Sequence, residues 1–195
     1  MRSLDIRFER FPLARDFTNS RGSKTEAEVI VCTVRDGDHA GRGECVPYAR
    51  YGETMASVRA AIEAAGDKIV QGIDRSVLLR AMPAGAARNA VDCALWDLEA
   101  RLSGRPAHEA AGEPSMGPLT TAVTISLGSP GEMAAEARTR ADRPLLKVKL
   151  GAGDVAERLQ AVAEAAPGAR LIVDANEGWA EADIEANLVA AARCG

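Results

Sequence analysis

Two short stretches decide the fold class of this chain: Leu145-Leu146-Lys147-Val148-Lys149 and Leu171-Ile172-Val173-Asp174-Ala175-Asn176. Each is an aliphatic run of strand length that ends in polar residues. Around them, strand-like and helical patterns alternate along residues 118–195. The expected elements are strands at 120–125, 145–150 and 171–174 and helices at about 130–140, 154–166 and 180–193. Because alternating strands and helices with short connections give parallel sheets and right-handed crossovers, this part is typical of a (β/α) barrel or a doubly wound sheet.

The first 117 residues follow a different pattern. Strand-like segments at 3–11, 26–35 and 40–46 predict a small antiparallel sheet. The helices expected after it are one that begins at Thr54 and extends through Ile69, a short one at 74–81, and a longer one between Pro83 and Gly104. We therefore expect an α+β domain at residues 1–117, followed by a separate α/β domain at residues 118–195.

Composition and charge exclude several classes of function. The 195 residues carry 24 Lys and Arg against 28 Asp and Glu, a net charge of −4, without a basic run, which argues against a nucleic-acid partner. No apolar stretch approaches the roughly 18 residues of a membrane span, and the first residues lack the apolar core of a signal peptide. We therefore expect a cytoplasmic protein with no membrane partner. The sequence leaves assembly into a homo-oligomer open.

The potential soft metal ligands are scattered along the chain. They are Cys32, Cys45, Cys93, Cys194, His39 and His108. Because none of them forms a Cys-x-x-Cys pair or a histidine pair at ligand spacing, a thiolate zinc site is not expected. We interpret the cysteines as reduced core or interface residues.

Functional groups of parallel α/β folds gather at the carboxyl ends of the strands. Lys147 and Lys149 lie two residues apart at such an end, so their side chains lie on one face of the strand. A neighbouring positive charge disfavours the protonated form of a lysine, which lowers its pKa toward the range of a general base. The alternative is a solvated strand end with two lysines that extend into water.

The next strand ends in a second polar pair. By the same alternation Asp174 and Asn176 share a face with Ile172, where Asp174 could bind Mg²⁺ and Asn176 could orient its neighbours. An Asp-x-Asn sequence after a strand can equally be a helix-capping turn. On the strand at 120–125, alternation directs Thr124 toward the same site.

Together these residues resemble the enolase superfamily, and in particular its muconate-lactonizing subgroup and the L-Ala-D/L-Glu dipeptide epimerases. The motifs that carry the resemblance are Arg21-Gly22-Ser23, the segment Gly43-Glu44-Cys45-Val46-Pro47-Tyr48-Ala49-Arg50-Tyr51-Gly52-Glu53, the segment Pro83-Ala84-Gly85-Ala86-Ala87-Arg88-Asn89-Ala90, and the two strand ends quoted above. The resemblance covers essentially all 195 residues. It implies an α+β capping domain followed by the first three β/α units of a (β/α) barrel.

The resemblance also implies a role for each candidate residue. Lys149 would be the base on one face of the substrate α-carbon, with Lys147 beside it, and Asp174 would be one Mg²⁺ ligand. The pocket around a dipeptide substrate would be lined by Arg21, Thr124, Tyr48, Arg50 and Tyr51. Arg21 would meet an acidic substrate side chain, and the Tyr48–Glu53 loop would close over the substrate. The alternatives are a surface cation at Arg21 and an ordinary loop at Tyr48–Glu53.

The site implied by the resemblance needs more strands than the three expected here. Two further metal ligands, an opposing lysine and an Asp-x-Asp segment have no counterpart in the chain. We therefore expect an N-terminal portion of a longer enzyme, or an incomplete record, and an isolated 195-residue polypeptide without activity.

The implied activity is Mg²⁺-dependent epimerisation of L-Ala-D/L-Glu or a related dipeptide, as in the recycling of cell-wall peptides. Three sibling activities stay open: muconate cycloisomerase, o-succinylbenzoate synthase and N-acylamino acid racemase. So does a non-catalytic role, as a truncated paralogue that acts as an interaction subunit.

Overall fold

The computed structural model describes residues 1–113 and 117–194, the side chain of Arg15 excepted. The chain divides into two compact units. The N-terminal unit comprises Met1–Pro12 and Glu26–Gly117, and the C-terminal unit comprises Leu13–Thr25 and Pro118–Gly195. Residues 13–25 therefore group with the later part of the chain, although they come from its first strands.

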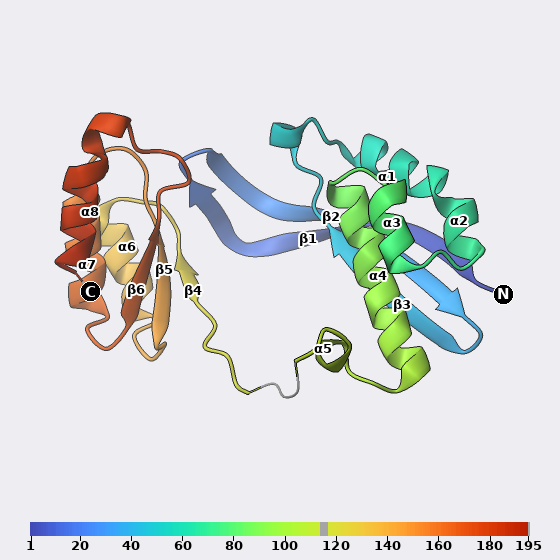
Figure 1. The fold of residues 1–195 in the computed structure, drawn as a ribbon. Coiled ribbons are helices and arrows are strands. Elements are labelled where there is room, and N and C mark those ends of the chain that lie inside the picture. Colours follow the sequence, from blue (N-terminus) through green and yellow to red (C-terminus); the bar gives the residue numbers. More distant parts are fainter. Residues whose placement is uncertain (114–116, 195) are drawn as a thin grey trace. The chain divides into compact units, whose positions relative to one another are not determined.

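The N-terminal unit is built on a three-stranded sheet in the order β1-β2-β3 (Figure 1). The strands are β1 (Ser3–Asn19), β2 (Gly22–Asp36) and β3 (His39–Cys45). Strands β2 and β3 pair antiparallel, with Ile30 opposite Cys45 and Asp36 opposite His39. The antiparallel sheet was predicted correctly, but β1 and β2 are longer than expected. They form a hairpin whose tip, residues 13–25, belongs to the C-terminal unit.

Five helices and a short 3-10 turn complete the described part of this unit. They are the turn η1 (Ala49–Tyr51) and the helices α1 (Met55–Ala64), α2 (Gly66–Val70), α3 (Arg75–Ala81), α4 (Ala86–Ser103) and α5 (Ala107–Ala110). Thr54 caps α1, because its hydroxyl accepts a hydrogen bond from the Ser57 amide. The single helix expected through Ile69 is divided at Ala65, just before Gly66, a residue that weakens helices.

Helix α4 approaches strand β3 closely because two glycines face it. A Cβ atom on Gly43 would lie 2.0 Å from the Ala90 carbonyl oxygen, and one on Gly41 would lie 2.1 Å from the Ala94 carbonyl oxygen. Both alanines are fully buried. The contact between helix and strand is therefore one of backbone against backbone.

Two of the four cysteines lie in the core of this unit, as expected. Burial raises the pKa of the Cys32 thiol to about 12 and that of Cys45 to about 11, so both are protonated and unreactive near neutral pH. Cys93 is exposed, and Cys194 is partly exposed and packs against the core of the C-terminal unit, so for Cys93 the interpretation as an interface residue stays a prediction.

The C-terminal unit contains a second sheet, with three parallel strands in the order β4-β5-β6. In chain order its elements are β4 (Val123–Ile125), α6 (Pro130–Arg138), β5 (Leu145–Lys149), α7 (Val155–Ala165), β6 (Arg170–Asp174), the 3-10 turn η2 (Glu181–Asp183) and α8 (Ile184–Ala192). The helices cover one face of the sheet (Figure 1). Strand β4 begins at Val123, three residues later than predicted.

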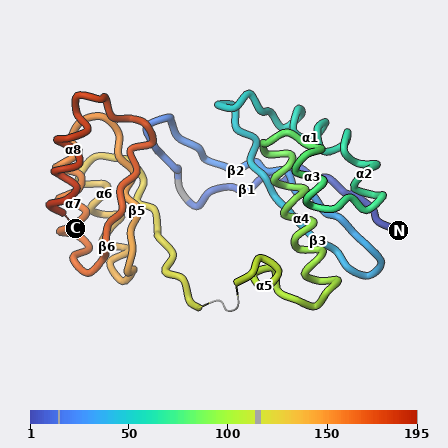
Figure 2. Tube along the Cα trace, in the orientation of Figure 1, coloured from blue at the N-terminus to red at the C-terminus, as the bar shows by residue number. Residues whose placement is uncertain are grey.

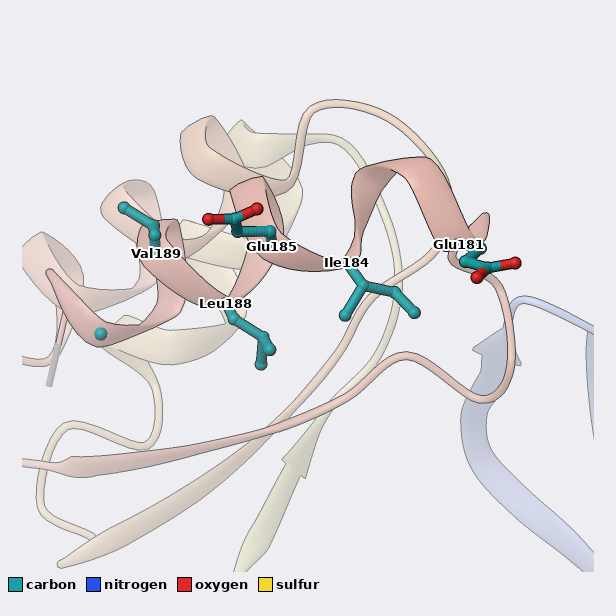
Figure 3. Close-up of a pocket in the computed structure, with 6 residues that line it drawn as sticks. Glu181, Ile184, Glu185, Leu188 and Val189 are labelled. Atoms are coloured by element: carbon teal, nitrogen blue, oxygen red, sulfur yellow. The ribbon is translucent and has the colours of Figure 1, made fainter.

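Helix α8 leaves an apolar face uncovered. Ile184, Leu188 and Val189 are each more than 40% exposed, and together with Glu181, Glu185 and Ala192 they line a groove of about 560 Å³. Figure 3 shows the Ile184 and Leu188 side chains on the same side of the helix. Within the described residues, no helix has the length and apolar character of a membrane span.

Candidate active site

The parallel register of the second sheet brings the predicted site residues together at the carboxyl ends of its strands. Thr124 of β4 lies opposite Lys147 of β5, and Lys149 lies opposite Asp174 of β6. Neighbouring residues of a sheet point to the same side, and residues two apart along a strand do so too. The four side chains therefore share one face.

The opposite face carries the core. Ile125, Leu146, Val148 and Leu150 are fully buried against α6 and α7, whereas Ile172, on the site face, is 42% exposed. Lys149 is an exception on its face, because only 6% of it is exposed. The predicted division into a helix-covered face and a polar face is confirmed.

One carboxylate joins both lysines. The Asp174 Oδ2 atom lies 2.7 Å from Lys147 Nζ and 2.8 Å from Lys149 Nζ. These two ammonium groups, that of Lys147 foremost, hold the pKa of Asp174 well below its usual range. The sequence reasoning treated the lysines as neighbours of each other and did not identify Asp174 as their common counter-ion.

Asn176 completes this cluster from a turn beyond β6. Its side-chain oxygen accepts a hydrogen bond of 2.9 Å from Lys149 Nζ, and its backbone N–H donates to Asp174 Oδ1 at 2.9 Å. Asn176 and Glu177 both have left-handed backbone angles, with φ of 47° and 62°. Neither Asp174 nor Asn176 caps a helix, since η2 begins after Ala180 and α8 after Asp183. The alternative interpretation of Asp-x-Asn as a helix cap is therefore wrong.

The hairpin tip of β1 and β2 contributes residues that the sequence analysis missed. The Ser20 hydroxyl donates to the Asn176 carbonyl at 2.7 Å, and Lys149 Nζ lies 5.6 Å from the centre of the Phe17 ring. In the Cα trace the tip lies beside the turn that follows β6 (Figure 2). The Arg21-Gly22-Ser23 motif marked this segment as interesting, but nothing in its pattern singled out Phe17 or Ser20.

Arg21 is exposed at this same tip, and its backbone N–H donates to the Asn19 side chain at 2.8 Å. Because residues 13–25 belong to the C-terminal unit, Arg21 lies in the same unit as the lysine cluster. A role for Arg21 in binding an acidic group stays a prediction.

The three other predicted binding residues lie in the N-terminal unit. Tyr48 and Tyr51 are exposed, with ring centroids 6.2 Å apart, and Arg50 is part of η1 between them. Glu53 holds this loop in place, because its carboxylate accepts hydrogen bonds from the backbone N–H groups of Tyr48 at 3.1 Å and Ala86 at 2.7 Å. Since the loop belongs to a different unit from the lysine cluster, its part in the site stays a prediction.

The cluster fits only part of a magnesium site. A carboxylate such as that of Asp174 is a hard oxygen ligand of the kind that Mg²⁺ prefers. The described residues contain no group of three or more His, Cys, Asp or Glu side chains that could hold a metal ion. Asp174 therefore has the chemistry of one magnesium ligand, but no cluster of three such side chains surrounds it among the described residues.

Known proteins of similar sequence belong to the family that the motifs and the strand-end cluster indicate. The family description "Mandelate racemase / muconate lactonizing enzyme, N-terminal domain" matches residues 1–112. The L-Ala-D/L-Glu epimerase of Escherichia coli is 44% identical over 181 residues, which cover 92% of this chain and 56% of that enzyme. The chain thus spans about half the length of the curated relatives that it matches.

Solved structures of dipeptide epimerases and their relatives are similar to this chain too. An enolase family member from Agrobacterium tumefaciens, with homology to dipeptide epimerases and with bound sodium and L-Ala-L-Glu, is 52% identical, with a TM-score of 0.95 over 100% of this chain and 60% of that one. The dipeptide epimerase of Methylococcus capsulatus, complexed with Mg and L-Arg-D-Lys, is 31% identical, with a TM-score of 0.87 over 99% and 58%.

Four observations point to the same family. They are the sequence motifs, the α+β N-terminal part, the three parallel strands that are consistent with the start of a barrel, and the match to the family description. The chain belongs to the mandelate racemase / muconate lactonizing enzyme family of the enolase superfamily.

Proposed function

We propose that the protein, at its full natural length, is a Mg²⁺-dependent epimerase of dipeptides of the L-Ala-D/L-Glu type. The observation that carries this proposal is the cluster in which Lys147 and Lys149 share the Asp174 carboxylate at the strand ends. The names of the relatives from Escherichia coli and Agrobacterium tumefaciens, both of which concern Ala-Glu dipeptides, support the choice of substrate.

In this proposal Lys149 is the base that removes the proton from the α-carbon next to the substrate carboxylate. Its buried position and its two fixed partners, Asp174 and Asn176, hold the amine in one orientation. Lys147 lies on the same face and adds positive charge near the substrate carboxylate. Asp174 would hold Mg²⁺. When bound, the ion stabilises the negative charge that develops on the carboxylate as the proton leaves.

The remaining predicted residues would define the substrate pocket. Thr124 lies opposite Lys147 on the site face and would line the pocket wall. Arg21 would pair with the acidic side chain of the substrate. The loop with Tyr48, Arg50 and Tyr51 would close over the substrate, and Glu53 would keep that loop in shape.

The fold proposal is an α+β capping domain at residues 1–117 and, at 118–195, the first three β/α units of a (β/α) barrel. The uncovered apolar face of α8 supports it, because a barrel helix packs against the unit that follows. A polypeptide of these 195 residues alone would be inactive, since it offers one carboxylate to the metal and a base on one side of the α-carbon. A cytoplasmic role in the recycling of cell-wall peptides is part of the same proposal.

The test is α-proton exchange in D₂O. The full-length protein with Mg²⁺ is incubated with a panel of dipeptides and N-acylamino acids, and deuterium at the α-carbon is followed by proton NMR. We expect the fastest exchange with dipeptides that have a carboxyl-terminal glutamate. Exchange confined to N-acylamino acids, or none at all across the panel, would refute the proposal.

A further inference from the structure

The hairpin tip is attached to the ends of all three strands of the second sheet. At β4, the Leu127 amide donates to the Thr18 carbonyl at 3.1 Å. At β5, Lys149 Nζ lies 5.6 Å from the centre of the Phe17 ring, and beyond β6 the Ser20 hydroxyl donates to the Asn176 carbonyl at 2.7 Å. Because these residues all belong to one compact unit, the tip forms one wall of the lysine cluster.

Asn176 depends on a backbone conformation that residues with side chains seldom adopt. Its φ is 47° and that of Glu177 is 62°, so two consecutive residues are left-handed without being glycine. In this conformation the Asn176 side chain reaches Lys149, while its carbonyl faces the hairpin tip. Rotation about the N–Cα bond of Asn176 moves its side chain and its carbonyl together, so a change in φ would take the side-chain oxygen away from Lys149.

The Ser20 side chain fits tightly against the same turn. A Cβ atom on Gly178 would lie 2.9 Å from the Ser20 Cβ and 2.9 Å from the Ala175 carbonyl oxygen. The turn is closed by a hydrogen bond of 2.8 Å from the Gly178 amide to that same carbonyl. Ser20 therefore contacts both ends of the left-handed segment, by a hydrogen bond at Asn176 and by packing at Gly178.

We propose that Ser20 is a positioning residue for the base Lys149. By holding the Asn176 carbonyl, Ser20 keeps the left-handed turn in place, and this turn directs the Asn176 side-chain oxygen at Lys149 Nζ. The role of Lys149 as the base rests on the proposed function. The dependence of the Asn176 position on Ser20 rests only on the hydrogen bonds and contacts described above.

The test compares three variants of the full-length protein with Mg²⁺: Ser20→Ala, Ser20→Thr and, as a matched control, Ser23→Ala. Ser23 is a serine of the same hairpin tip, and its hydroxyl pairs with the Thr18 hydroxyl at 2.6 Å. Because Lys149 serves one face of the α-carbon, Ser20→Ala is expected to slow deuterium exchange with retention from one epimer of L-Ala-Glu by roughly five- to tenfold, the effect of one lost hydrogen bond. Exchange from the other epimer should change less than twofold. Ser20→Thr, which keeps the hydroxyl, should restore the rate, and Ser23→Ala should match the wild type.

Equal slowing from both epimers would show a merely structural role, and unchanged rates would show no role, so either result overturns the inference. A crystal structure of Ser20→Ala gives an answer that does not need turnover. We expect the Lys149 Nζ to Asn176 Oδ1 distance to lengthen beyond hydrogen-bond range. A distance that stays near 2.9 Å would overturn the inference even if the wild type exchanges no dipeptide, an outcome that would separately refute the proposed function.

Discussion

Gly43→Ala tests whether the backbone contact between β3 and α4 holds the N-terminal unit together. The added methyl group would lie 2.0 Å from the Ala90 carbonyl oxygen and 2.6 Å from the Ala94 amide nitrogen, where ordinary contacts begin near 3.4 Å. Neither neighbour is a flexible side chain, so α4 would have to move away from β3 by about 1.4 Å. A gap of this size forfeits much of the dispersion energy along the contact.

Overpacking of a core costs about 1–3 kcal/mol, and here the upper end is expected because both neighbours are backbone atoms. Urea unfolding followed by far-UV circular dichroism measures the change. Gly66→Ala is the matched control, because its Cβ would meet only the Leu4 side chain at 3.8 Å, in a helix that alanine favours. If the unfolding free energy of Gly43→Ala stayed within about 0.5 kcal/mol of the wild-type value, the close approach of β3 and α4 would not contribute measurably to stability.

Variants at three further positions test the site and its supporting loop. Lys149→Ala in the full-length protein is expected to abolish α-proton exchange from at least one epimer of L-Ala-Glu; survival of exchange from both would assign the base elsewhere. Asp174→Asn is expected to reduce unfolding free energy more at pH 6 than at pH 3, as measured by urea titration in metal-free buffer. The depressed pKa of Asp174 means that its ionised form stabilises the fold above about pH 4, and that this contribution is lost as the pH falls toward the folded-state pKa. An equal loss at both pH values would contradict that sign. Glu53→Ala is expected to cost about 1–3 kcal/mol in thermal unfolding, because two backbone N–H groups lose their acceptor, and Glu53→Gln should cost less.

The parts of the fold that follow from local pattern could be predicted from the sequence. Alternation along β5 and β6 was enough to assign Lys147, Lys149 and Asp174 to one face and Leu146, Val148 and Val173 to the other. The start of α6 also follows from local pattern, because Ser129-Pro130-Gly131-Glu132 has the spacing of a capping box, and the Ser129 hydroxyl and the Glu132 carboxylate each accept the backbone N–H of the other residue. Both rules depend only on residues a few positions apart.

Local pattern was a weaker guide where a tertiary contact or an unusual backbone angle determines the conformation of a residue. The helix expected from about residue 154 begins at Val155, and Asp154 before it is a residue type that commonly caps helices, but it has a left-handed φ of 47° and makes no side-chain cap. Its carboxylate lies 3.6 Å from the Arg158 guanidinium instead. Asn176 does lie at the lysine cluster, but it reaches Lys149 through a turn, because β6 ends at Asp174 and strand alternation no longer applies.

The contribution of Phe17 and Ser20 could not be predicted, because a polar hairpin tip has no periodicity that names its partner. Its contacts lie with residues more than 100 positions later in the chain, such as Leu127 and Asn176. Patterns along a sequence reveal faces and turns, whereas only the folded chain reveals which distant segment a hairpin tip meets.

The distance along the chain between Ser20 and Asn176 has a consequence for biosynthesis. The two residues are separated by 156 positions, so at about 5–20 residues per second a ribosome makes the hairpin tip roughly 8–30 s before its partner exists. The contacts between the tip and the second sheet are absent through this interval, and the largely polar sequence Asp16-Phe17-Thr18-Asn19-Ser20-Arg21 suits exposure to water. Contacts of this sequence separation form late and slowly. The contact between the hairpin tip and the lysine cluster therefore forms only after the segment around Asn176 has been made.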